Sequence, residues 1–156
     1  MAKKERKDQQ PTKRKRPKAG YRARHGDRVL QTWTVGPLPV VNRLLQRMRL
    51  EEILQRHLPP DDPRLEVPTA RCLLLLVRNV LLSREPIYGL GEWAECYAPD
   101  LLGLTPRQLG QLNDDRVGRS LDRLFDGATS QFLMDVVRQM VSEFDLKMDE
   151  LHNDST

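Results

Sequence analysis

The segment from Thr69 to Ser83 constrains the fold most strongly, because its residues predict a helix that is apolar on almost every side. It ends shortly before Pro86, which cannot continue a helix. Such a helix is stable in water only when other elements cover it, so we predict that it is the central helix of the core. Its narrow polar stripe consists of Arg71, Arg78 and Asn79.

Apolar residues recur at helical spacing on both sides of this segment, and proline, glycine or capping residues separate the repeats. Asn113 and Thr129 are the expected N-caps of the last two helices, because such side chains accept a hydrogen bond from a free helical N–H group. We therefore predict an all-α fold, a compact bundle of five to six helices. The further helical segments run across residues 40–48, 53–58, 87–97, 113–126 and 129–144, with a short piece opening at Thr105-Pro106.

The same spacing predicts which side chains of the last two helices face the core. Each helix carries its apolar residues on one side, and we expect that side to be buried. In residues 113–126 these are Val117, Leu121, Leu124 and Phe125. In residues 129–144 they are Phe132, Leu133, Val136, Val137, Met140, Val141 and Phe144.

The charge of the chain is divided unevenly along its length. Residues 1–28 hold twelve Lys or Arg against three Asp or Glu, whereas residues 29–156 hold fourteen against nineteen, so the two parts carry formal charges of +9 and −5. The first part has no aliphatic periodicity and cannot repay the entropy of ordering, so we predict a disordered basic arm. Such an arm can follow a nucleic-acid backbone, or it can serve only as a solubilising tail. Its candidate DNA-binding residues are Lys13, Arg14, Lys15, Arg16, Lys18, Arg22 and Arg24.

The chain divides into three parts: the arm at 1–28, a helical domain at 29–147, and residues 148–156, which predict the start of a β-strand. Residues 29–35 are rich in β-formers and predict a short strand or an extended entry to the helices. No stretch approaches the roughly 20 apolar residues of a membrane span, so we expect a cytoplasmic protein with no membrane partner. Cys72 and Cys96 lack metal-site or redox-site spacing, and we expect no cofactor for this chain.

Arg116, Arg119 and Arg123 lie on one stripe of the helix expected at 113–126, the placement that a helix reading a DNA groove needs. Acidic residues lie three or four positions away, so ordinary surface ion pairs explain the same pattern and are the simpler interpretation. The acids concerned are Asp115, Asp122 and Asp126. A second basic surface, with the same two interpretations, consists of Arg43, Arg47, Arg49 and Arg56.

The last six residues, 151–156, read as a strand that carries one inward carboxylate, Asp154. Together with the helical part, they resemble the DDE transposases of bacterial insertion sequences, in which a helical domain precedes a ribonuclease-H-like catalytic domain. The resemblance runs from about residue 35 to residue 156. The segments that carry it are Val35-Gly36-Pro37-Leu38-Pro39, Glu92-Trp93-Ala94-Glu95, Leu112-Asn113-Asp114-Asp115-Arg116-Val117-Gly118-Arg119 and Leu121-Asp122-Arg123-Leu124.

The resemblance implies that Asp154 corresponds to the first of the Asp-Asp-Glu metal ligands of an intact transposase, which binds Mg²⁺. One carboxylate cannot hold a metal pair, so we expect this chain to be an N-terminal fragment without catalytic activity of its own. The resemblance further implies DNA as a partner, and a homodimer or a heteromer with an intact transposase. It places the protein in the bacterial cytoplasm, at the nucleoid when bound to DNA.

A second interpretation comes from a different class of protein. A small helical interaction protein has the same composition if its basic tail contacts RNA or ribosomes and its core only assembles with a partner. The basic arm by itself does not separate the two interpretations, because contacts with a phosphate backbone carry no sequence information.

Overall fold

The computed structural model describes residues 22–25, 28–127 and 129–148. Within these ranges the chain is all-α apart from one small β-hairpin, so the predicted fold class is confirmed. Five of the helices are eight residues or longer, in agreement with the predicted bundle. The elements are β1 (Arg22–His25), β2 (Arg28–Gln31), α1 (Leu38–Arg47), α2 (Leu50–His57), α3 (Thr69–Leu82), η1 (Ile87–Gly89), α4 (Leu90–Glu95), η2 (Pro99–Leu102), α5 (Pro106–Leu109), α6 (Asp114–Asp126) and α7 (Thr129–Phe144).

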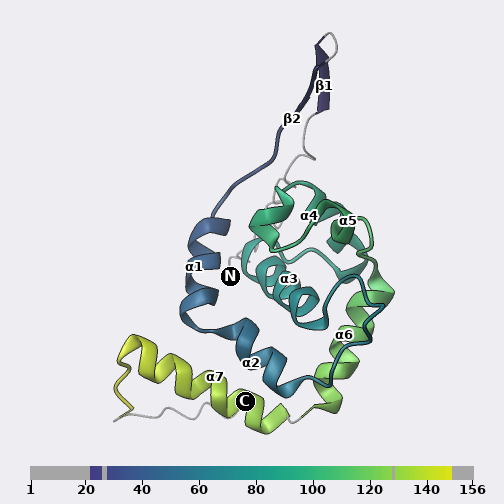
Figure 1. Ribbon diagram of the computed structural model, residues 1–156. Helices are drawn as coiled ribbons and strands as arrows, with labels where there is room; N and C mark the ends of the chain where they lie inside the picture. Colours follow the sequence, from purple (N-terminus) through teal and green to yellow (C-terminus); the bar gives the residue numbers. More distant parts are fainter. Residues whose placement is uncertain (1–21, 26–27, 128, 149–156) are drawn as a thin grey trace, which may run out of the picture.

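A small hairpin lies at the C-terminal end of the segment predicted to be a disordered basic arm. Strands β1 and β2 pair antiparallel, with Arg22 opposite Gln31 and His25 opposite Arg28. Gly26-Asp27 stands between the strands in the sequence, and such a pair is a recognised hairpin signal that the composition argument overlooked. The predicted strand near residue 29 therefore finds its partner immediately upstream. Figure 1 shows the hairpin projecting from the helices, whereas residues 1–21 lie outside the described part of the chain.

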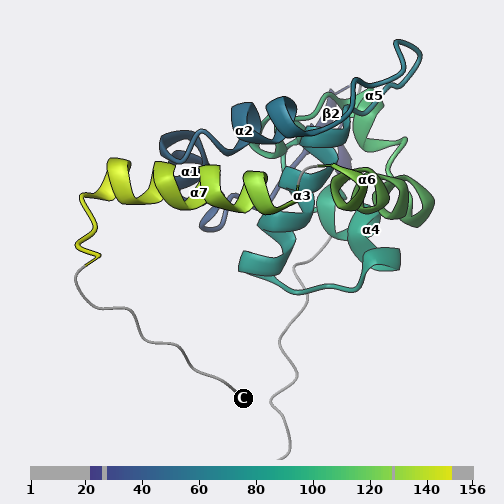
Figure 2. The same cartoon turned by 90° about the horizontal axis from the view of Figure 1, so that it is seen from below.

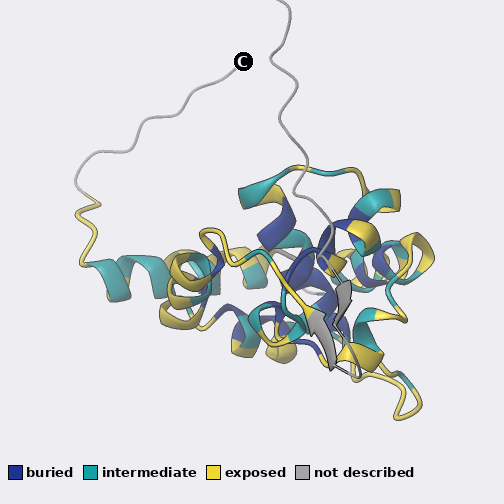
Figure 3. Ribbon diagram, turned by 90° about the horizontal axis from the view of Figure 1, so that it is seen from above, coloured by how far each residue is buried: buried dark blue, intermediate teal, exposed yellow. Residues whose placement is uncertain are grey.

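Helix α3 lies at the centre of the helical assembly, as predicted (Figure 2). Figure 3 shows that the buried residues gather in the middle of the helical assembly, and eight of them belong to α3. Two hydrophobic clusters meet along this helix, and together they form the core. One contains Cys72 and Leu75 of α3 with Leu38, Trp93, Leu102 and Val117; the other contains Leu73 and Leu74 of α3 with Leu45, Leu50 and Leu54.

The extended segment before α1 lies against the end of α4. The backbone N–H of Thr34 donates to the carbonyl oxygen of Cys96 at 2.8 Å, and Thr34 forms a parallel β-bridge with Tyr97. The side chain of Leu38 then enters the core with no exposed surface. Neither Cys72 nor Cys96 forms a disulfide, and burial raises the pKa of both thiols.

Helices α6 and α7 differ in how far they are covered. Asn113 caps α6 as predicted, because its side chain accepts a hydrogen bond from the backbone N–H of Arg116 at 2.8 Å. Helix α7 lies along α2 at the edge of the assembly, and none of its described side chains is buried. The predicted inward placement is therefore wrong for Phe125, which is 82% exposed, and for Leu133 and Val137, which are exposed on α7.

No helix in the described ranges is long and apolar enough to cross a membrane.

Truncation of a core leucine tests the central position of α3. Leu75 has no exposed surface, so Leu75→Ala removes buried methyl groups and leaves a cavity, and we expect a loss of about 2–5 kcal/mol in the free energy of unfolding. Leu133 on α7 is 55% exposed and serves as the matched control. We expect Leu133→Ala to change stability by less than about 1 kcal/mol. Urea denaturation followed by circular dichroism measures both, and equal losses would contradict the assignment of α3 as the central helix.

Candidate functional site

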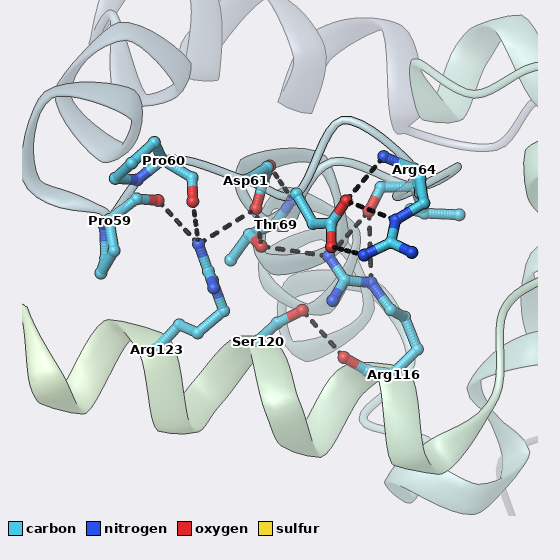
Figure 4. Close-up of polar contacts among 10 residues, drawn as sticks. Pro59, Pro60, Asp61, Arg64, Thr69, Arg116, Ser120 and Arg123 are labelled. Atoms are coloured by element: carbon cyan, nitrogen blue, oxygen red, sulfur yellow. Dashed lines mark hydrogen bonds and ion pairs between the residues drawn. The ribbon is translucent and has the colours of Figure 1, made fainter.

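The first arginine of the predicted DNA-binding stripe binds the protein itself. Arg116 extends from α6 toward the loop before α3 (Figure 4). Its Nη2 donates to the carbonyl oxygen of Val67 at 2.7 Å and to Oγ1 of Thr69 at 3.0 Å, and its Nε donates to the same carbonyl at 3.2 Å. The guanidinium group therefore fixes the backbone at the point where the loop enters α3.

Arg123, seven residues further along α6, binds the other end of that loop. Its Nη2 donates to the carbonyl oxygens of Pro59 and Pro60, both at 2.8 Å. The same nitrogen lies 3.4 Å from the carboxylate of Asp61. Figure 4 shows the side chain standing between α6 and these three residues. A proline-rich loop offers many carbonyl acceptors and few N–H donors, so an arginine is a suitable partner for it.

Asp61 joins the two arginine contacts through Thr69. Its carboxylate accepts hydrogen bonds from the backbone N–H of Thr69 at 2.9 Å and from the Thr69 hydroxyl. Thr69 is the first residue of α3, where the backbone N–H has no partner inside the helix and a negative charge is favourable. Asp61, Thr69, Arg116 and Arg123 thus form one network, which we call the α6 clamp.

The α6 clamp accounts for two of the three arginines of the predicted DNA-binding stripe, Arg116 and Arg123, without any contact with DNA. The predicted alternative, ion pairing with nearby acids of the same helix, holds only for Arg119, whose Nη2 lies 3.7 Å from the carboxylate of Asp115. Arg119 is also the one arginine of the stripe with a mostly exposed side chain, at 70%. Sequence reasoning missed the partners of Arg116 and Arg123, because they lie roughly fifty to sixty residues upstream.

The second basic surface is partly neutralised by α7. Arg47 donates from Nε to the carboxylate of Glu143 at 2.8 Å, and its guanidinium lies 4.6 Å from the centre of the Phe144 ring. Arg56 lies 3.4 Å from the carboxylate of Asp135. Within the described ranges, the side chains of Arg43 and Arg49 form no hydrogen bond or ion pair. Helix α7 therefore contributes acids as well as apolar side chains to its contact with α1 and α2.

Asp135 is the centre of the contact between α2 and α7. Its carboxylate lies 2.9 Å from Nε2 of His57, and His57 packs edge-on against Phe132. The hydrogen bond from His57 holds the pKa of Asp135 below its usual value, with smaller contributions from the charges of His57, Arg56 and Arg138.

Most arginines of the helical domain are neutralised in this way. Eight of the thirteen arginines between residues 43 and 138 lie within 4.0 Å of a carboxylate oxygen. Residues 29–156 also carry more acids than bases. The helical domain therefore presents little uncompensated positive charge, whereas residues 1–28 have a large excess.

Comparison with known protein families assigns the chain to one family. The chain belongs to the family described as a domain of unknown function, DUF4277, whose model matches residues 30–138. No curated protein and no solved structure matched the chain. The matched range begins inside β2 and ends within α7, so it includes the whole α6 clamp and the core around α3.

The remaining candidate residues lie outside the DUF4277 match. Arg22 and Arg24 belong to β1, upstream of it. Five further basic residues of the arm and the candidate metal ligand lie outside the described residues, as does the predicted strand at the C-terminus. They are Lys13, Arg14, Lys15, Arg16, Lys18 and Asp154.

A comparison of two arginines on the same helix tests the clamp. Arg123→Met removes two hydrogen bonds to carbonyl groups and the ion pair with Asp61, so we expect it to lower the free energy of unfolding by about 1–3 kcal/mol. Arg119→Met removes only an exposed ion pair, so we expect a change below about 0.5 kcal/mol. Thermal and urea denaturation measure both variants. Equal stability of the two would show that the contacts of Arg123 within the clamp contribute nothing to stability.

Proposed function

We propose that this chain is the DNA-binding and assembly module of a DDE transposase, and that its basic N-terminal segment provides the main contact with DNA. The observation that carries the proposal is the separation of charge. The segment 1–28 has an excess of nine positive charges, whereas the helical domain neutralises most of its arginines internally.

The position of the hairpin supports this role for the segment. Strands β1 and β2 project from the helices, so the residues before them join the domain through an extended connection (Figure 1). A positively charged segment attached in this way can follow a phosphate backbone without requiring a helix to enter a groove. Each Lys or Arg that neutralises a phosphate releases a counterion, which makes the affinity strongly dependent on salt.

The segments that resemble transposases support a shared helical domain. Trp93, within the resembling segment Glu92–Glu95, is buried in α4, and its Nε1 donates to the Ser83 hydroxyl at 2.8 Å. Asn113 caps α6, and Arg116 and Arg123 belong to the clamp. These residues maintain the fold. A resemblance to transposases at such positions is what a shared helical architecture would produce.

The resemblance assigns one metal ligand, Asp154, to this sequence, whereas Mg²⁺-dependent strand transfer needs the complete Asp-Asp-Glu set. We therefore propose binding for this chain, and not strand chemistry of its own. Exposed apolar side chains on α7, namely Leu133, Met134 and Val137, support the assembly part of the proposal, because such a surface favours contact with another chain.

A salt titration tests the proposal. Deletion of residues 1–21 removes nine Lys or Arg and leaves the hairpin in place. We expect the deletion to weaken binding to duplex DNA at least about tenfold in low salt. The slope of log K against log salt should also fall, by about 0.9 for each phosphate that the shortened chain no longer neutralises. Fluorescence anisotropy with a labelled duplex, at several salt concentrations, measures both quantities.

Arg119→Gln and Arg43→Gln are the matched controls, because both side chains lie on the surface of the helical domain. We expect each to leave the affinity within about twofold of the parent protein. The proposal is wrong if the deletion variant keeps its affinity and slope while Arg119→Gln loses them. Tighter binding to duplex RNA than to DNA would instead favour the interaction protein with an RNA-contacting tail.

A further inference from the structure

A pocket of about 440 Å³ lies where α1, α2 and α3 meet the turn formed by η2. It is separate from the α6 clamp. Apolar side chains of α1 and α3, among them Leu45 and Leu74, form part of its wall, and Asn42 and Arg78 add polar groups. Its size falls in the range of pockets that hold small molecules.

Arg78 is the unusual residue of this pocket. Its side chain is buried, with only 8% of the residue exposed, yet it forms no ion pair with any carboxylate of the described chain. Among the described residues its side chain forms one hydrogen bond, from Nε to Oδ1 of Asn42 at 2.8 Å. Asn42 is itself held in place, because its Nδ2 donates to the carbonyl oxygen of Leu101 at 2.7 Å. The terminal N–H groups of Arg78 therefore have no protein acceptor among the described residues.

A buried guanidinium group without an anionic partner is energetically unfavourable. Burial lowers the pKa of Arg78, and the charge of Glu51 opposes that shift only in part. Glu51 is also shared with Arg71, whose Nε lies 3.4 Å from its carboxylate. An oxyanion in the pocket would give these N–H groups a charged acceptor in place of water, since the planar fork of arginine matches a carboxylate in a bidentate geometry.

The other charged residues of the pocket restrict which anion fits. Besides Arg78, the lining contains one more cation, Arg49, and three carboxylates, those of Glu51, Glu52 and Asp100, so its formal charge is −1. This excess of carboxylates disfavours a ligand that carries two or more negative charges, and Glu52 and Asp100 are the exposed members. The same two carboxylates attract a positive group. We propose that the pocket binds a small amphoteric molecule, with its carboxylate on Arg78 and its cationic group toward Glu52 and Asp100.

Binding of small probes to the full chain tests this proposal. The probes are L-arginine, which carries a carboxylate and positive groups, acetate, which carries a carboxylate alone, and inorganic phosphate. We expect saturable shifts of the Arg78 Nε–Hε resonance in NMR spectra, with L-arginine binding about three- to fivefold more tightly than acetate. Phosphate is expected to bind more weakly than either carboxylate.

Two variants and a control complete the experiment. Arg78→Met lacks the Nε–Hε group, so binding to the variants is followed through the backbone amide resonances of Asn42 and Gly103, which line the pocket. Arg78→Met should abolish saturable binding, whereas Arg43→Met, outside the pocket on α1, should leave it unchanged. Glu52→Gln changes an exposed residue, and should remove most of the preference for L-arginine over acetate even if Arg78→Met does not fold.

Three results would overturn the proposal: no saturable shift with either carboxylate, binding that persists unchanged in folded Arg78→Met, or phosphate as the tightest probe. An unchanged preference for L-arginine in Glu52→Gln would overturn the placement of the positive group. Because none of these measurements uses DNA, they fail or succeed independently of the proposed DNA-binding function.

Discussion

Most arginines of the helical domain find their acceptors within the domain, with the buried Arg78 as an exception, and this constraint shapes both the fold and the expected function. Arg116 and Arg123 of α6 hold the loop that leads into α3, and Asp61 satisfies the first backbone N–H of that helix. Buried or half-buried guanidinium groups need acceptors, and here carbonyl groups and carboxylates of the same chain supply them. Little positive charge is left for a partner on the surface of α6.

The clamp also connects the surface to the core. Thr69 has no exposed surface and binds both Asp61 and Arg116, so the start of α3 is fixed from two sides. From that point α3 runs through both hydrophobic clusters. Helix α7, by contrast, depends mainly on α2, where Asp135 pairs with His57, and it leaves apolar side chains exposed. The assembly therefore has a firmly held centre and one peripheral helix.

Local sequence patterns predicted the features that depend on interactions between neighbouring residues of the chain. The apolar periodicity of residues 69–83 identified the central helix, and Asn113 identified the start of α6, because a cap and a stripe are encoded within a few neighbouring residues. The exposure of Phe125 and Leu133 was not predictable in the same way, since periodicity shows which side chains share a face and not whether another element covers it. The partners of Arg123 and the lack of an anionic partner for Arg78 likewise depend on segments that only the folded chain brings together.

Membership in DUF4277 assigns the chain to a family and not to an activity, and the charge distribution indicates where to look for that activity. The most direct measurement is hydrogen–deuterium exchange of the full chain with and without duplex DNA. The account predicts that DNA slows exchange within residues 1–31 and leaves α6 unchanged. Slower exchange confined to α6, with no change before residue 31, would contradict it.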